Sequence, residues 1–150
     1  MTPRALSVEQ VERLQSLVIR KRLRIVPIDL NKAVRFLDQA HEALREISKI
    51  EGAKLKHGIA YDVAHDVGEA LIAAYGFATT NGSGQHQTIG EALAIVFLGT
   101  AGEQESEVFE QMREERNQIR YRSSSIGLAQ ADSAVSCGEI LLETARKILE

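Results

Sequence analysis

The sequence predicts an all-α fold, an antiparallel up-and-down bundle of four to five helices with an extra helical arm at its amino terminus. Apolar residues recur every three to four positions over long stretches, which is the period of a helix that packs one face on a core. The 150 residues include 2 prolines, and no stretch shows the alternation of a half-buried strand. Short connections between the helical stretches favour antiparallel neighbours.

Composition limits the kind of protein that this chain forms. Aromatic residues make up 5% and tryptophan is absent, so the core must be aliphatic. A net charge of -3 argues against a protein that coats DNA by bulk electrostatics. Cys137 is the sole cysteine, which excludes an intrachain disulfide and suits a reducing compartment. No apolar run approaches the roughly 20 residues that span a bilayer, and residues 1–7 lack the apolar core of a signal peptide. We expect a cytoplasmic protein without membrane contact.

Residues 1–28 are predicted to form the arm. Ser7 and Gln10 have the spacing of a capping box, in which each side chain binds the other residue's backbone N–H. The helix that follows runs into the basic cluster at 20–24, and Pro27 closes the arm. This cluster is interpreted as a solvated helix end, with a phosphate-contacting arm as the alternative.

Residues 29–150 are predicted to form the bundle. A first helix begins at Asp29 and stops near Gly52. A second helix covers about 54–78 and carries two apolar bands, so it should contact neighbours on both sides and lie at the centre.

The second half of the bundle begins with a polar, glycine-rich loop over 79–86. Thr88 and Glu91 have the spacing of another capping box, which would start a short apolar helix. A helix over 103–121 is acidic first and basic last, matching the helix dipole. After a serine-rich loop, the last helix starts near Leu128.

The helix over 103–121 holds the most informative residues. At 100° per residue, Arg116 falls between Phe109 and Met112, inside the apolar face. A guanidinium aimed at a core needs an anionic partner, because an unpaired buried charge is very costly. The other polar side chains that line its flank and complete the candidate ligand-binding set are Arg113, Asn117, Arg120 and Tyr121.

Two partners for these arginines are open from the residues alone. In the first, Arg113 and Arg116 pair with carboxylates of the central helix, for which the candidates are Asp62, Asp66 and Glu69. In the second, the arginines line a polar cleft that receives a phosphate or an RNA backbone.

The run from Arg116 and Asn117 to Tyr121 resembles the Arg-Asn-x-x-x-His or Arg-Asn-x-x-x-Tyr element of HEPN domains (higher eukaryotes and prokaryotes nucleotide-binding), which lies near the end of a late helix. The segment 69–75, the glycine loop with His86 and the small-residue final helix follow the HEPN layout in order. The resemblance covers 29–150. It implies a four- or five-helix bundle, and a homodimer whose motif faces a cleft at the subunit interface.

Catalytic HEPN proteins are metal-independent endoribonucleases, in which the arginine and a histidine a few residues later act on the RNA phosphate and 2′-hydroxyl. Here Tyr121, Arg122 and Ser123 occupy the positions of that histidine. A phenol, with an ordinary pKa of about 10, is a poor base at neutral pH, whereas imidazole titrates at about 6.5. We therefore expect a non-catalytic protein that binds a nucleotide or RNA, either as one half of a toxin–antitoxin pair or beside a nucleotidyltransferase partner.

Two other functions stay open. An endoribonuclease would use Arg116 with Tyr121 or with His86, whose loop can fold over the cleft to supply the missing imidazole or can cap the next helix. A purely structural interaction module would use the arginines only as ion-pair partners.

A metal site is a weaker interpretation of the central helix. Asp62 and His65 form one Asp-x-x-His unit, whereas a di-iron bundle needs carboxylates from several helices and two Glu-x-x-His units. We expect no metal and no other cofactor. His57, near a helix start, is expected to be solvated.

Overall fold

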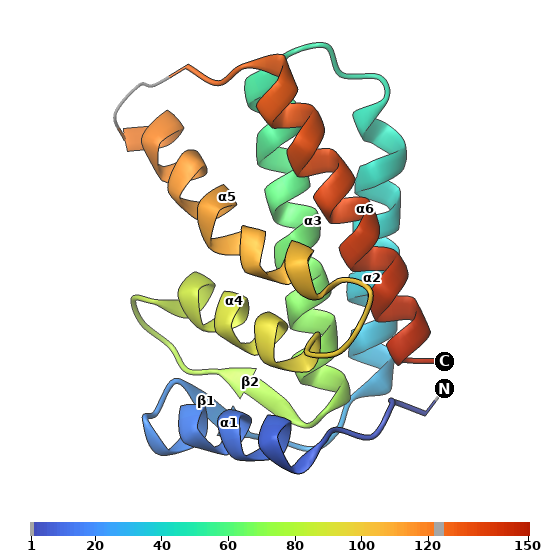
Figure 1. Cartoon of the computed structure of the whole chain (residues 1–150), viewed down its shortest axis with the longest axis vertical. Coiled ribbons are helices and arrows are strands. Elements are labelled where there is room, and N and C mark those ends of the chain that lie inside the picture. The colour runs from blue at the N-terminus through green and yellow to red at the C-terminus, as the bar shows by residue number, and fades with distance from the viewer. Residues whose placement is uncertain (1, 122–124) are drawn as a thin grey trace.

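The computed structural model describes residues 2–121 and 125–150 and confirms the all-α class and the helical bundle (Figure 1). The elements in chain order are α1 (Val8–Ile19), β1 (Leu23–Ile25), α2 (Leu30–Ile47), α3 (Ala53–Ala74), β2 (Phe77–Thr79), α4 (Gln85–Val96), α5 (Glu103–Tyr121) and α6 (Leu128–Ile148).

The long helix α3 lies at the centre of the bundle, as its two apolar bands predicted. It packs against α2 and α6 and is crossed by α4 and α5 (Figure 1). Its buried side chains are mostly small, so neighbouring backbones come close. A Cβ added to Gly138 of α6 would meet Cγ1 of Val63 at 3.3 Å, which shows how closely α6 approaches α3.

The predicted helix starts are partly right. Gln10 donates its backbone N–H to Oγ of Ser7 and accepts the Ser7 N–H on Oε1, which completes the capping box of α1. Asp29 caps α2 by accepting the N–H of Lys32. Gly52, predicted to end the first bundle helix, instead precedes α3 as its N-cap, because α2 already ends at Ile47.

The predicted capping box at Thr88 is wrong, because α4 begins three residues earlier, at Gln85. Gly84 turns the chain with a φ of 92°, a left-handed conformation that glycine adopts without steric cost. The helix therefore starts directly after this turn. The Thr88 hydroxyl lies inside the first turn and donates to the Gly84 carbonyl.

A short antiparallel sheet corrects the expectation of a chain without strands. β1 pairs with β2, with Leu23 opposite Thr79 and Ile25 opposite Phe77. α1 ends at Ile19, so the basic cluster leaves the helix and enters β1 rather than extending it. Three-residue strands are too short to show a period, which is why the pattern failed to reveal them. The pairing attaches the amino-terminal segment to the bundle.

Two glycines bring α4 close to its neighbours. A Cβ on Gly68 of α3 would lie 2.4 Å from Cγ2 of Ile89, and one on Gly90 of α4 would lie 2.6 Å from Cδ1 of Phe109. α4 therefore packs closely against both α3 and the first half of α5. From this contact α5 runs at an inclination to α3 and α6 (Figure 1).

None of the helices in the described part of the chain is long and apolar enough to cross a membrane.

Candidate functional site

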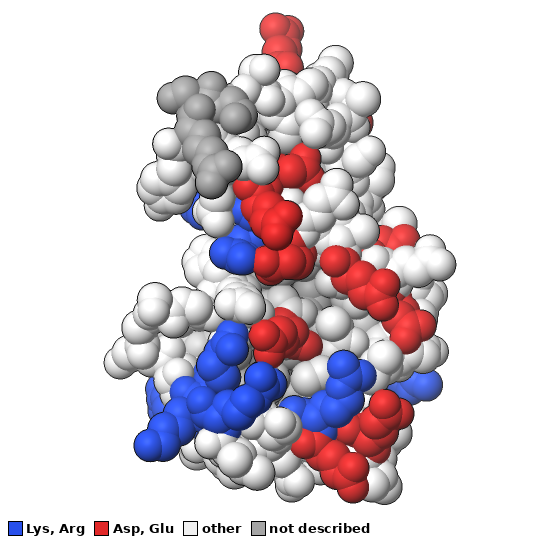
Figure 2. All heavy atoms as spheres, turned by 60° about the vertical axis from the view of Figure 1, so that its left-hand side comes forward, with Lys and Arg blue, Asp and Glu red and all other residues white. Residues whose placement is uncertain are grey.

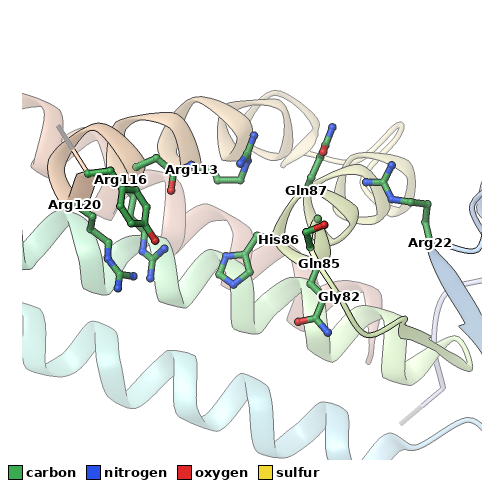
Figure 3. Close-up of a pocket in the computed structure, with 12 residues that line it drawn as sticks. Arg22, Gly82, Gln85, His86, Gln87, Arg113, Arg116 and Arg120 are labelled. Atoms are coloured by element: carbon green, nitrogen blue, oxygen red, sulfur yellow. The ribbon is translucent and has the colours of Figure 1, made fainter.

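A cleft of about 780 Å³ opens between the carboxyl-terminal half of α5 and the loop that leads into α4. Figure 3 shows its two ends: Arg116 and Arg120 lie at one, Arg22, which directly precedes β1, lies at the other, and His86 projects between them. The residues that line it are Arg22, Gly82, Ser83, Gly84, Gln85, His86, Gln87, Arg113, Arg116, Asn117, Arg120 and Tyr121.

The helical period of α5 explains why its polar residues meet in this cleft. Arg113, Arg116, Asn117 and Arg120 recur at intervals of three and four residues and so share one face. The adjoining face of α5 is buried in the bundle through Phe109, Met112 and Ile119. The structure thus brings together the whole predicted ligand-binding set, including Tyr121, a residue that is 75% exposed at the end of the helix.

Arg116 is half-buried at the edge of the apolar face, and an aromatic ring supports it. Its Cζ lies 4.9 Å from the centre of the Tyr61 ring, within the range of a cation–π contact. Tyr61 is fully buried in α3 and stacks on Phe109, with ring centres 5.2 Å apart. Because the guanidinium lies over the face of the Tyr61 ring, its N–H groups remain available for hydrogen bonds to water or a ligand.

The predicted carboxylate partners of the arginines are not the ones observed. Arg113 pairs with Glu110 of its own helix, with Nε donating to Oε2 at 3.0 Å. Glu110 is one turn away on the same helix, so it reaches Arg113 without a contact between helices. Among residues 2–121 and 125–150, no aspartate or glutamate forms an ion pair with Arg116.

The three carboxylates of α3 lie beside the cleft rather than in its lining. Partial loss of solvent raises the pKa of Asp62, and the positive charge of Arg116 opposes that rise. Burial raises the pKa of Asp66 to about 6, helped by repulsion from its acidic neighbours, and burial also raises the pKa of Glu69. Oε1 of Glu69 lies 4.0 Å from Nε2 of His65. The described part of the chain holds no group of three or more His, Cys, Asp or Glu side chains arranged for a metal ion.

The His86 side chain lies in the middle of the cleft and is held there by the buried Tyr61. Its Nδ1 lies 2.6 Å from the Tyr61 hydroxyl. Burial, which disfavours the charged imidazole, lowers the pKa of His86, and Arg116 adds to the effect by repulsion. The same causes, with His86 itself contributing, lower the pKa of neighbouring His65 to about 4. Both imidazoles are therefore neutral at pH 7.

The Tyr61 contact decides which nitrogen of His86 faces a ligand. Burial raises the pKa of Tyr61 to about 12, so the phenol keeps its proton. A phenol is a better donor than a neutral imidazole N–H, and the bare imidazole nitrogen is the better acceptor, so we assign the Tyr61 O–H as donor to Nδ1. The proton of the neutral ring then sits on Nε2, which becomes a hydrogen-bond donor for an anion.

The first turn of α4 closes the other side of the cleft. Among residues 2–121 and 125–150, no side chain caps this helix. The leading N–H groups of an α-helix have no partner within the helix, and they carry the positive end of its dipole. Residues 84–87 of this turn line the cleft, so its backbone donors add to the arginine side chains.

Charge in the cleft is opposite to that of the whole chain. Its lining includes four arginines and, among the described residues, no aspartate or glutamate, whereas the chain carries a net charge of -3. Figure 2 shows Lys and Arg side chains above and below a hollow on this face, with Asp and Glu side chains beside it. The hollow is therefore a local basic site on an acidic protein.

Two residues of the site were absent from the predicted set. Arg22 belongs to the basic cluster that was interpreted mainly as a solvated helix end, yet its side chain lines the cleft. Tyr61 looked like one member of an apolar band, yet it supports both Arg116 and His86. A signal for Tyr61 was present, because a buried tyrosine hydroxyl needs a hydrogen-bond partner. Arg122 and Ser123 lie outside the described residues.

No protein-family model, no curated protein and no solved structure matches this chain.

Proposed function

We propose that the cleft binds phosphate groups of RNA or of a nucleotide, and that the chain is a non-catalytic, HEPN-like binding protein. One observation carries the proposal: four arginines meet in a cleft whose described lining has no acidic side chain. Guanidinium groups are suited to phosphate because their planar N–H donors bind two oxygens at once. The resemblance of Arg116, Asn117 and Tyr121 to the HEPN element supports the same ligand class.

Each residue on α5 has a role that follows from its position. Arg116, stacked on Tyr61 and free of a carboxylate partner among the described residues, neutralises the phosphate. Asn117 orients the ligand or Arg116 by hydrogen bonding. Arg120 adds charge, and Tyr121 offers an exposed ring on which a base stacks.

Binding is favoured over cleavage by the state of His86. A general base needs a free lone pair within reach of the proton that it removes. With Nδ1 engaged by Tyr61, the nitrogen left for the ligand is a protonated Nε2, which donates and does not accept. His86 in this tautomer strengthens phosphate binding without starting RNA cleavage.

The test replaces Arg116 with alanine and uses Arg45→Ala, an exposed arginine of α2, as the matched control. Fluorescence anisotropy with a labelled single-stranded RNA and calorimetry with ATP measure binding, and circular dichroism checks the fold. Removal of one good charged interaction should weaken binding tenfold or more, about 1.4 kcal/mol or above. It should also lower the slope of log affinity against log salt by about 0.7 for each phosphate that the variant no longer neutralises. Equal affinities for the two variants would contradict the proposal.

An endoribonuclease is the second candidate, because His86 and Arg116 line the same cleft. It requires the opposite tautomer, with the lone pair on Nε2. Incubation of the pure protein with total RNA in EDTA decides the matter: cleavage that disappears in His86→Ala establishes the enzyme, and intact RNA removes it. A purely structural module has less support, since its expected carboxylate partners for Arg116 are absent among the described residues.

The remaining parts of the proposal concern assembly. A homodimer with the motif at its interface, a nucleotidyltransferase or antitoxin partner, and a place in the cytoplasm all come from the HEPN resemblance. Light scattering coupled to gel filtration measures the mass in solution, and a monomer at all concentrations would remove the dimer while leaving the binding site as proposed.

A further inference from the structure

The amino-terminal segment, which the HEPN resemblance does not cover, reaches into the cleft at Arg22. Nε of Arg22 donates to Oγ1 of Thr88 at 2.9 Å. The Thr88 hydroxyl in turn donates to the carbonyl of Gly84 at 3.0 Å. A hydroxyl can accept one hydrogen bond while donating another, so the two contacts form a directed chain from Arg22, just before β1, into the first turn of α4.

A second set of contacts holds the start of the same loop. The Thr80 hydroxyl donates to the carbonyl of Lys21 at 2.8 Å, and the Thr80 N–H donates to the carbonyl of Arg22 at 3.2 Å. Gln85 closes the loop on itself by donating from Nε2 to the carbonyl of Thr80 at 3.2 Å. Residues 81–84, which join these anchors, are therefore fastened at both ends.

The loop needs such anchors because of its composition. Gly82 and Gly84 adopt φ values of 123° and 92°, and nothing lies within 4 Å of where a Cβ would be on either. Glycines without packing contacts have many alternative conformations. Hydrogen bonds from residues outside the loop therefore select the observed conformation.

Two contacts fix the position of the Arg22 guanidinium. Its Nη2 lies 3.5 Å from Oε1 of Glu91, so a carboxylate already offsets part of its positive charge. Its side chain is 28% exposed and is held between Glu91 and Thr88. A guanidinium with a fixed orientation and a nearby carboxylate is suited to bracing the loop, whereas Arg116 has no such carboxylate among the described residues.

We propose that Arg22 is a positioning residue, which holds the 80–88 segment so that His86 stays over Tyr61 in the cleft. His86 lies midway between Gly84 and Thr88, the two residues that the Arg22 chain connects. The amino-terminal segment is thus part of the binding site. The expected effect of Arg22 on ligand binding rests on the proposed function, whereas its effect on the conformation of the loop does not.

Two substitutions at Arg22 separate bracing from charge. In Arg22→Gln, Nε2 of the glutamine occupies the place of the arginine Nε, so the donor to Thr88 is kept and the charge is removed. In Arg22→Lys a carbon occupies that place, so the charge is kept and the donor is removed. Thr88→Val and Thr88→Ser form a second pair, which removes or keeps the hydroxyl.

Amide hydrogen exchange of the 80–89 peptide in the ligand-free protein measures how firmly the Arg22–Thr88 contact holds the loop. We expect exchange about tenfold faster in Arg22→Lys and Thr88→Val, and near-wild-type exchange in Arg22→Gln and Thr88→Ser. Exchange in Arg22→Lys that equals wild type, or that is matched by Arg22→Gln, would overturn the inference. Circular dichroism confirms that each variant is folded.

Binding of the labelled single-stranded RNA gives the second readout. Affinity should fall about fivefold in Arg22→Lys and less than that in Arg22→Gln, because the placed loop matters more than the charge. The reverse order would show that Arg22 binds phosphate directly, and the positioning role would be rejected. If wild-type protein binds no RNA or nucleotide, the proposed function fails, and the exchange data still decide whether Arg22 braces the loop.

Discussion

The two halves of this bundle use their helices in opposite ways. In the half built from α2, α3 and α6, alanines and glycines let the helices approach closely, and the buried side chains are almost all apolar. In the half built from β1, α4 and α5, Gly68 and Gly90 let α4 lie close to α3 and to the first half of α5, and beyond these contacts arginine and glutamine side chains line a cleft. The close contacts hold the helices in place, and the divergence leaves room for a ligand.

Two histidines show what the difference means for chemistry. His57 is fully buried, and neither of its ring nitrogens has a hydrogen-bond partner among the described residues. His86 lines the cleft, and a tyrosine hydroxyl binds its Nδ1. Burial lowers the pKa of both imidazoles, yet only His86 has its ring orientation set by a hydrogen bond and a nitrogen left for a ligand. The expectation that His57 is solvated is therefore wrong, because its ring is covered inside the bundle, with Oε2 of Glu115 3.9 Å away.

The largest expected effect breaks the close contact between the halves. In Gly68→Ala the new methyl would lie 2.4 Å from Cγ2 of Ile89, so the buried Ile89 side chain, or α4 with it, must shift away from α3. We expect a decrease of about 3 kcal/mol in the free energy of unfolding, at the upper end for overpacking, measured by urea denaturation. RNA affinity should fall as well, since α4 carries His86.

Gly58→Ala is the control for this prediction, since it lies in the same helix and has nothing within 4 Å of its Cβ position. Alanine there should stabilise the protein by about 0.5–1 kcal/mol, because glycine is a poorer helix former. Equal effects at the two positions would show that the α3–α4 contact is not tight.

A smaller effect is expected from Tyr61→Phe, which removes one oxygen and keeps the ring beneath Arg116. His86 then lacks the donor to Nδ1 that favours its neutral form, so its pKa should rise towards the ordinary value of about 6.5. Proton NMR titration of the His86 ring measures this shift. We expect RNA affinity about five- to tenfold weaker at pH 7.5, and an unchanged titration would refute the assigned hydrogen bond.

The smallest expected effect concerns His57, the buried histidine of α3. Because burial lowers the pKa of His57 in the folded state, the unfolded chain takes up the proton first as the pH falls. This part of the stability is present above about pH 6.5 and is lost at lower pH. When the pH falls from 7.5 to 5, the free energy of unfolding should therefore decrease by about 1 kcal/mol less in His57→Leu than in wild type. Urea denaturation at both pH values measures this difference.

Other titrating groups act in the same pH range and remain in both proteins, so they cancel in that comparison. His65, with a pKa of about 4, destabilises the fold in the same direction as His57 when the pH falls. Asp66, with a pKa raised to about 6, has the opposite sign, since its protonated form is favoured by folding and that gain is lost as the pH rises through 6. Equal pH dependence of wild type and His57→Leu would show that His57 does not titrate on unfolding.

Local patterns in the chain were enough to predict the all-α class, the cap at Ser7, the start of a helix at Asp29, and the bounds of α5. They also placed Arg113, Arg116 and Asn117 on one face of that helix. These features depend on residues within one or two helical turns of each other, so a period of 3.6 residues is sufficient to reveal them.

Interactions between distant segments decided the rest. The pairing of β1 with β2, the stacking of Arg116 on Tyr61 and the bond from Arg22 to Thr88 all join residues that are more than 50 positions apart. No periodic signal connects such residues, because their meeting depends on how closely α3, α4 and α5 pack. The arginine face is thus a property of one helix, and the cleft that makes it a site is a property of the folded molecule.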